Sequence, residues 1–306
     1  MPRIEPAVMT MEFTIPVSTA ARYIDISAAA SVLNRKFFRQ GLNWVLGGAT
    51  IVSAPTSAGD ITMSHLQTNW VTANSWTKAF KAWKRQQDEA LEEADQESVK
   101  GRYNDFKIYA DIQHVETAAP HFLLPRDLDG AEYDAPEEWL YSEVVVPNNQ
   151  GTVGDTDEFT LHMHGPDAGN SRGLVVAYRD SRSAPQSPDP AVPGLPQVGL
   201  YTDMFNVGMD GSEVVSNAAF RNDELPYRQD LYPGGSNNGP TLQLMNRITL
   251  NPVSTIPGKY NVRGGTIPCG IIKIDAATVT AEFTLILHMV PGEHRGYMAQ
   301  PMQEMN

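Results

Sequence analysis

The sequence predicts an all-β protein: a single jelly-roll antiparallel β-sandwich with one long helix and long surface loops. Three observations lead to this prediction. Short stretches of alternating apolar and polar residues, about ten in all, are typical of strands with one buried face. No regular succession of strand and helix occurs, so a parallel sheet is not expected. The 22 Pro and 24 Gly residues among 306 indicate many turns.

The amino-terminal third is expected to contain one helix among several strands. Residues 28–39 carry an apolar face and a basic face at helical spacing, and Gly41 follows as a stop signal. Pro55 and Gly59 mark a turn between two of the strands. The strands expected in this part of the chain are 11–17, 22–27, 43–54 and 61–71.

The longest helix is expected over residues 76–97, with Asn74 or Ser75 as its N-cap. The rings of Trp76, Phe80 and Trp83 recur at helical spacing and therefore share one face. Cations occupy its first half and anions its second half, which opposes the helix dipole by roughly 0.3–1 kcal/mol per charge. We interpret this costly arrangement as two oppositely charged ends that face different partners.

Further strands are expected after the helix, separated by loops. The final stretch is the clearest alternation in the chain, with Val279, Phe283 and Leu287 on one face. Residues 119–138 have the Pro, Gly and Asp content of a loop. The expected strands are 106–112, 139–146, 158–164, 173–178, 241–250, 266–275 and 277–290.

A single domain is expected to span residues 1–306. Its additions are an N-terminal segment (1–20), a loop-rich outer-surface insertion (181–240) and a C-terminal extension (291–306). An aperiodic stretch as long as the insertion, rich in Pro and Gly, usually forms functional surface. No run of about 18 apolar residues occurs, so no membrane span is expected. Cys269 is the only cysteine, which excludes an intrachain disulfide and indicates a buried, unreactive thiol.

The net charge of −13 is unevenly distributed along the chain. Residues 1–87 carry nine Lys and Arg against four Asp and Glu, whereas residues 88–170 carry four against twenty. A uniformly acidic protein repels nucleic acid, but a protein with separated charges can bind it on one side. The basic candidates for nucleic-acid contact are Arg3, Arg35, Lys36, Arg39, Lys78, Lys81, Lys84 and Arg85. Nearby aromatic residues (Phe37, Phe38, Trp76, Trp83) match the combination of stacking and phosphate contact that single strands require.

Two weaker patterns point to metal chemistry. His162 and His164 lie on one face of an expected strand, as histidine ligands do in metal-dependent jelly-roll enzymes. Asp127 and Asp129 precede Gly130 in a stretch that resembles part of a calcium loop but lacks its closing Glu. The plainer interpretations are a polar strand face and a solvated acidic turn. We therefore expect no metal, no cofactor and no catalytic residues. No phosphate-binding or nucleophile motif is found.

Several sequence strings together resemble the capsid proteins of small circular Rep-encoding single-stranded DNA viruses. They are residues 21–27 (ARYIDIS), 34–44 (NRKFFRQGLNW), 68–76 (TNWVTANSW), 83–88 (WKRQQD) and 103–109 (YNDFKIY), together with the closing strand 279–290. The resemblance covers about the first 115 residues and that strand. Known relatives begin with an Arg-rich arm, whereas residues 1–17 contain only Arg3, so DNA binding by such an arm is not expected here.

The resemblance implies a non-enzymatic protein whose copies, about 60 in a T=1 arrangement, close into an icosahedral shell around single-stranded DNA. It also implies a virion localisation and no membrane partner. The host receptor remains open. Two alternatives from other classes stay open at this point: a metal-dependent jelly-roll enzyme that uses His162 and His164, and a carbohydrate- or receptor-binding β-sandwich.

Overall fold

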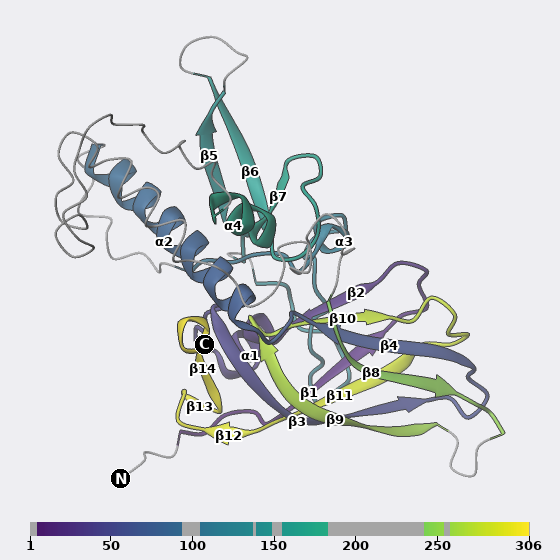
Figure 1. The fold of residues 1–306 in the computed structure, drawn as a ribbon. Helices are drawn as coiled ribbons and strands as arrows, with labels where there is room; N and C mark the ends of the chain where they lie inside the picture. The colour runs from purple at the N-terminus through teal and green to yellow at the C-terminus, as the bar shows by residue number, and fades with distance from the viewer. Residues whose placement is uncertain are drawn as a thin grey trace, which may run out of the picture.

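The computed structural model describes residues 5–93, 105–136, 139–148, 155–182, 242–253 and 258–305. Two antiparallel sheets face each other and form a sandwich (Figure 1). Hydrogen-bonded neighbours in the first sheet follow the order β1 (Thr10–Ile15), β11 (Phe283–Met289), β3 (Leu42–Ser53) and β9 (Lys259–Pro268). The second sheet has the order β2 (Arg22–Asp25), β10 (Ile271–Asp275), β4 (Gly59–His65) and β8 (Gln243–Leu250).

The strand pairs are nested along the chain. β1 pairs with β11, β2 with β10, β3 with β9 and β4 with β8, and all four pairs are antiparallel. A long hairpin produces this pattern when it is rolled up across two sheets, and the result is a jelly roll. The predicted fold class, an all-β jelly-roll sandwich with one long helix, is confirmed.

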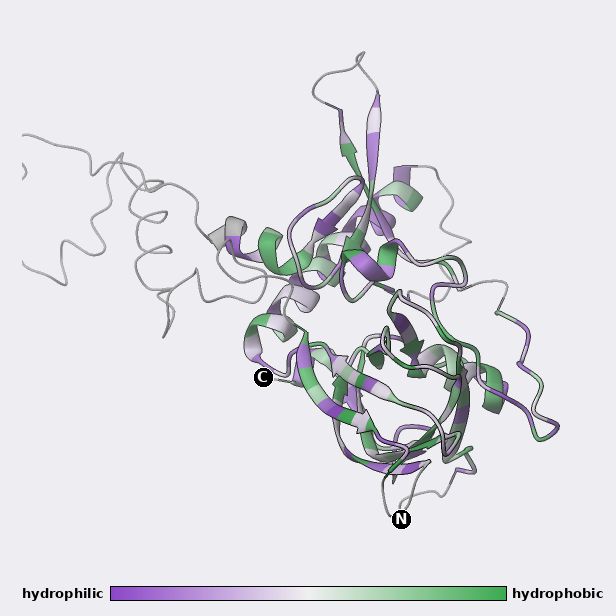
Figure 2. Ribbon diagram, turned by 90° about the vertical axis from the view of Figure 1, so that its right-hand side faces the viewer, coloured by the Kyte–Doolittle hydropathy of each residue, from purple (hydrophilic) through white to green (hydrophobic). Residues whose placement is uncertain are grey.

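Apolar side chains from both sheets fill the space between them. Alternate residues of β1 (Met11, Phe13 and Ile15) are buried, and those of β11 are buried in the same way. Trp44 of β3 is completely buried, and its indole Nε1 donates a hydrogen bond to Ser27 Oγ at 3.0 Å. Figure 2 shows the strands curving around this interior, with apolar and polar residues alternating along them. Each buried large side chain contributes roughly 1.5–3 kcal/mol.

The two ends of the sandwich differ in their connections (Figure 1). At one end, which we call the compact end, successive strands are joined by the short segments 16–21, 54–58, 251–258 and 276–282. The opposite end carries helix α1 between β2 and β3, the connection from β4 to β8, the start of β1 and the end of β11. We call it the elaborated end. The two ends of the sandwich are therefore strongly different.

Helix α1 (Ile26–Asn34) begins and ends earlier than the expected span 28–39. The Asp25 carboxylate accepts hydrogen bonds from the backbone N–H groups of Ser27 at 2.9 Å and Ala28 at 3.2 Å, so the helix starts directly after β2. Arg35 has a left-handed backbone conformation with φ of 52°, which ends the helix.

Helix α2 (Trp70–Glu93) is the long helix and begins before the expected residue 76. Asn69 Oδ1 accepts a hydrogen bond from Thr72 N–H at 2.9 Å, so Asn69 stabilises the first turn in place of the expected Asn74 or Ser75. The expected strand 61–71 consequently ends at His65. The expected end of the helix at residue 97 lies outside the described residues.

An additional layer, which we call the insert lobe, packs against part of the outer face of the second sheet. Apolar residues from α2, β6 and α4 form a second hydrophobic cluster with Tyr23 of β2 and Ile271 of β10. Figure 1 shows β5, β6, β7 and α4 above this sheet, with α2 beside them. Besides α2, the lobe contains α3 (Ile112–Val115), β5 (Glu143–Pro147), β6 (Thr156–His162), β7 (Ser171–Gly173) and α4 (Leu174–Arg182).

Sequence patterns predicted the lobe less well than the sandwich. The expected strand 173–178 is mostly helix α4, because its apolar residues also fit a helical spacing over so short a stretch. The expected strand 106–112 is not one of the named strands, and its ladder contact is a single bridge between Tyr109 and His162. Residues 106–111 are all buried, so both faces of this segment are covered by other parts of the chain. Its alternation of residue types therefore does not separate a buried face from an exposed one.

The C-terminal extension folds back onto the sandwich. It contains β12 (Pro291–Gly292), β13 (Gly296–Tyr297), β14 (Ala299–Pro301) and the 3-10 helix η4 (Met302–Glu304). β14 pairs with the start of β3, next to the part of β3 that pairs with β11. Tyr297 and Met302 are completely buried, so this extension is an integral part of the fold.

Two predicted regions fall largely or wholly outside the described ranges: residues 183–240 of the loop-rich insertion, and Arg3. Within the described ranges, no helix combines the length and apolar character needed to cross a membrane.

Candidate nucleic-acid interface

The first group of predicted basic residues lies in the segment between α1 and β3. The Arg35 guanidinium lies over the Tyr133 ring, 5.9 Å from its centroid. Lys36 Nζ pairs with Glu5 at 3.7 Å, and both side chains are about one-third exposed. Arg39 is exposed and makes no ion pair within the described part of the chain. Of these three residues, Arg39 is therefore the one whose charge is available to a ligand.

The second group lies on the solvent-facing side of α2, where all four side chains are exposed. Lys78 Nζ donates a hydrogen bond to Ser181 Oγ at 2.6 Å, and Arg85 pairs with Glu89 at 2.6 Å. Lys81 and Lys84 make no ion pair within the described residues and extend into solvent. Such exposed charges contribute little to folding stability, so they are available for long-range attraction of an anion.

The aromatic residues that accompany these cations are used mainly for internal contacts. Phe38 is completely buried in the sandwich core, and its side chain has no surface for a base. Trp76 is 5% exposed and stacks on Phe80, with ring centroids 5.1 Å apart. Phe37, Phe80 and Trp83 are half-buried and keep part of their surface accessible.

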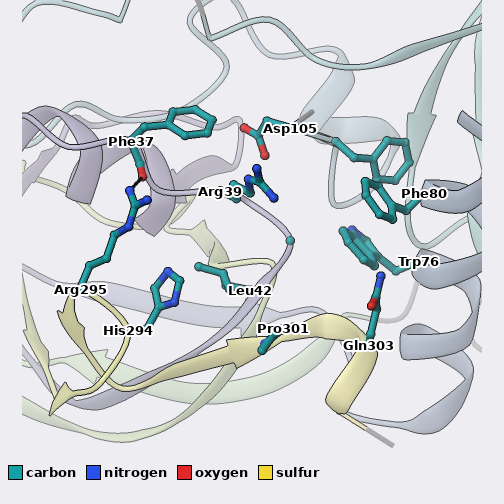
Figure 3. Close-up of a pocket in the computed structure, with 12 residues that line it drawn as sticks. Phe37, Arg39, Leu42, Trp76, Phe80, Asp105, His294, Arg295, Pro301 and Gln303 are labelled. Carbon is teal, nitrogen blue, oxygen red and sulfur yellow. Dashed lines mark hydrogen bonds between the residues drawn. The ribbon is translucent and has the colours of Figure 1, made fainter. Parts of the chain in front are cut away.

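A pocket brings Arg39 of the first basic group together with aromatic residues of α2 (Figure 3). Its volume is about 390 Å³, and it lies between the segment before β3, the first turns of α2, the segment after residue 104 and the C-terminal extension. Arg39, Phe37 and Trp76 of the predicted set line it. Its remaining lining residues are Gly41, Leu42, Phe80, Asp105, Phe106, His294, Arg295, Pro301 and Gln303. Sequence reasoning did not anticipate Asp105, Arg295 or Gln303 there, since no local pattern links them to residue 39.

A buried polar network lies beside this pocket. Lys107 Nζ is 2.8 Å from Asp105 Oδ2 in a nearly buried ion pair, although the contact is not aligned as a hydrogen bond. The Gln40 side-chain amide donates to Asp25 Oδ2 at 3.0 Å and accepts from Ile108 N–H at 2.6 Å. Burial raises the pKa of the Asp25 carboxyl to about 6, against the hydrogen bonds that favour its ionised form. This network joins the sandwich to the insert lobe.

The predicted acidic turn is stabilised by its own backbone. Asp127 Oδ1 accepts hydrogen bonds from Asp129 N–H at 2.9 Å and from Ala131 N–H at 2.8 Å. Gly130 has φ of 81°, a conformation that glycine adopts without strain. The Asp127 carboxylate therefore closes a turn, and Asp129 is exposed beside it.

The two histidines of β6 are buried in the insert lobe. His162 Nδ1 is 2.7 Å from Ser171 Oγ, and its Nε2 is 3.2 Å from the carbonyl oxygen of Pro166. His164 Nε2 accepts a hydrogen bond from Gln67 N–H at 3.3 Å. Burial lowers the pKa of His164 to about 3, and burial also lowers the pKa of His162, so both rings are neutral at pH 7.

Within the described ranges, no group of three or more His, Cys, Asp or Glu side chains is arranged to hold a metal ion. The enzyme alternative therefore has no ligand set in this part of the chain. Cys269 is completely buried, and burial raises the pKa of its thiol well above the ordinary value. Comparisons with protein-family models, with curated proteins and with solved structures find no match for this chain.

Proposed function

We propose that this chain is the subunit of a small icosahedral viral capsid that self-assembles around single-stranded DNA. The jelly-roll topology, the sequence strings that resemble such capsid proteins and the separation of basic from acidic regions all support this proposal. The subunit has a structural role in it, and no residue is assigned to catalysis.

The observation that carries the proposal is a pair of exposed valines in the connections of the compact end. Val17, between β1 and β2, is 61% exposed, and Val253, between β8 and β9, is 88% exposed. Both belong to the short connections of a sandwich whose interior is already filled. Exposed apolar side chains of this kind are stabilised when another copy of the chain covers them.

The asymmetric shape of the subunit suits a closed shell. The end with short connections can approach a symmetry axis together with its copies, while the elaborated end stays away from that axis. A contact that is repeated by rotation closes into a ring, and several such axes close a shell. The basic residues of α2 and the acidic residues that follow residue 88 provide opposite charges for contacts between neighbours.

Electron microscopy and light scattering of the full chain test this proposal. We expect closed particles of uniform diameter. The double substitution Val17→Asp and Val253→Asp is expected to abolish them, because it places charges in a contact between copies, while the subunit keeps its circular dichroism spectrum. Val146→Asp, at a 38% exposed valine on β5 of the insert lobe, is the matched control and should leave particles intact.

The outcomes separate the parts of the proposal. A wild-type chain that stays monomeric at high concentration over a range of salt would contradict the capsid function. Particles that survive the double substitution would contradict only the assignment of the compact end as a contact. Binding to a glycan array by a chain that never assembles would favour the binding-sandwich alternative.

A further inference from the structure

We infer that the pocket between the segment before β3, helix α2 and the C-terminal extension binds one nucleotide unit of single-stranded nucleic acid. The base contacts the aromatic walls, and the phosphate lies near the arginines at the rim. This inference rests on the proposed function, since it assigns a specific place in the subunit to the enclosed strand.

The walls of the pocket suit a planar ring. Figure 3 shows Phe37 on one side of the pocket and Trp76 with Phe80 on the other, with Arg39 between them. The Trp76 and Phe80 rings are inclined by only 13° and leave no space between them, so a base contacts the surface of this pair rather than entering it. A volume of about 390 Å³ is sufficient for a nucleotide. Stacking on aromatic rings tolerates every base, as a genome-enclosing site requires.

The aromatic wall is held rigidly in place. Gly41 lies against the Trp76 ring so closely that a β-carbon at residue 41 would overlap it. Phe106 contacts the edge of Trp76, with ring centroids 5.8 Å apart and planes inclined by 70°. A ring fixed in this way loses little conformational entropy when a ligand binds, which favours affinity.

The charges around the pocket favour an anion. Arg39 is exposed at the rim without an ion pair in the described residues. The Arg295 guanidinium donates a hydrogen bond to the carbonyl oxygen of Phe37, which holds it near the rim. Asp105 is the carboxylate among the lining residues, and Lys107 already compensates its charge. The two arginines therefore provide the net field, and guanidinium groups bind phosphate well.

One buried donor in the wall has no partner. Trp76 Nε1 is inaccessible to solvent and makes no hydrogen bond within the described ranges. The whole residue is only 5% exposed. Buried N–H groups are normally paired, so an unpaired one requires an explanation. The edge of a base carries acceptor atoms, so a base in the pocket brings the kind of partner that this donor lacks.

A binding experiment with disassembled subunits tests the inference. The probes are a fluorescent single-stranded oligonucleotide of about 12 residues, an abasic oligomer of equal length and charge, and free dCMP. Binding is followed by anisotropy and by quenching of tryptophan fluorescence. We expect the normal oligomer to bind about tenfold more tightly than the abasic one, because only the former stacks. Quenching should decrease in a Trp76→Phe variant, which keeps an aromatic ring in the wall.

Variants identify the pocket as the site. Phe80→Leu and Arg39→Gln are each expected to weaken oligomer binding by about fivefold to tenfold. Only Arg39→Gln should also make the affinity depend less steeply on salt concentration, because it removes a phosphate contact. Arg247→Gln, which removes an exposed arginine from β8, is the matched control and should change the affinity by less than about twofold. Retained thermal stability excludes misfolding as the cause of any loss.

Three results would overturn the inference: equal binding of normal and abasic oligomers, unchanged affinity in both pocket variants, or quenching by dCMP without oligomer binding. Quenching that depends on protein concentration without any nucleic acid would also overturn it, and would assign the pocket to a second copy of the chain. If particles form but the pocket variants bind DNA normally, only this inference fails. A chain that binds the oligomer in its pocket but never forms particles contradicts the capsid function alone.

Discussion

The sandwich and the insert lobe are stabilised by different kinds of interaction. Between the two sheets, the core is a continuous apolar cluster that strands from both halves of the chain complete by nested pairing. The lobe, in contrast, buries many ionisable groups. Of the eight buried Asp, Lys and His residues in the described ranges, six belong to the lobe: Asp105, Lys107, Asp111, His114, His162 and His164. The other two, Asp25 and His65, lie at the elaborated end of the sandwich.

Because of this difference, we expect the stability of the two regions to respond to different perturbations. Apolar burial depends weakly on pH, so the sandwich should be sensitive chiefly to lost volume. Buried ionisable groups are held in one protonation state by their surroundings, so the lobe should be sensitive chiefly to pH and to the loss of single hydrogen bonds. Four experiments either sharpen this contrast or remove it.

The largest effect is expected from Trp44→Ala in the sandwich core. This substitution empties a completely buried site and leaves Ser27 Oγ without its donor, so the free energy of unfolding should fall by about 3–5 kcal/mol. Urea denaturation of the chain measures this fall, which should be the same at pH 7 and pH 5. A cost below about 1 kcal/mol would mean that the sandwich core is not the main source of stability.

The second effect is acid destabilisation of the lobe. Burial lowers the pKa of both His114 and His164 to about 3, whereas the unfolded chain titrates near 6.5. The unfolded state therefore binds more protons between these values, and stability falls as pH falls from about 6.5 toward 3. At pH 4.5 each of these two histidines should lower the free energy of unfolding by about 2 kcal/mol relative to pH 7.

The Asp25 carboxyl acts in the opposite sense. Burial raises the pKa of Asp25 to about 6 in the folded chain, above its ordinary value of 3.8. The folded state is therefore stabilised by this group as pH falls from about 6 toward 3.8. Asp25 belongs to the sandwich, so hydrogen exchange at pH 7 and pH 4.5 should show faster opening in the lobe than in the sandwich strands. His164→Gln should reduce the dependence of lobe opening on pH. Equal acceleration in both regions would remove the proposed contrast.

A smaller effect is expected where the two regions meet. Gln40→Ala removes three hydrogen bonds, to Asp25 and to both backbone groups of Ile108, and should lower the free energy of unfolding by about 1–2 kcal/mol. Gln300→Ala, at an exposed glutamine of β14, serves as the control for denaturant unfolding. If both variants unfold at the same urea concentration, the lobe is not attached through Gln40.

The smallest effect is expected at the contact between α2 and the edge strand β5. The Gln86 amide donates to the carbonyl oxygen of Val145 at 2.6 Å and accepts from its N–H at 3.1 Å, as a neighbouring strand would. Gln86→Ala should cost about 0.5–1 kcal/mol and accelerate exchange of the Val145 amide. Gln87→Ala is the control, and unchanged exchange at Val145 in both variants would contradict this role.

The sequence was informative where one side of a segment faces apolar surroundings and the other faces solvent. Residues 11–15 and 283–289 show this alternation and form strands, although β11 begins at Phe283 and the expected span began at residue 277. Segment 106–112 has the same alternation but is buried on all sides, so the pattern misled. The pocket depends on contacts between residues such as Arg39 and Arg295, which are far apart in the chain. Local periodicity contains no information about such a pair.

The point at which the insert lobe leaves and rejoins the sandwich has a practical consequence. His65, the last residue of β4, and Gln243, the first residue of β8, are register partners in one antiparallel pair. The two junctions therefore lie side by side, where an ordinary β-hairpin loop would connect them. The lobe is thus an insertion at the turn of a β-hairpin. We expect that a foreign domain whose own termini are adjacent fits between these two junctions without changing the pairing of the eight sandwich strands.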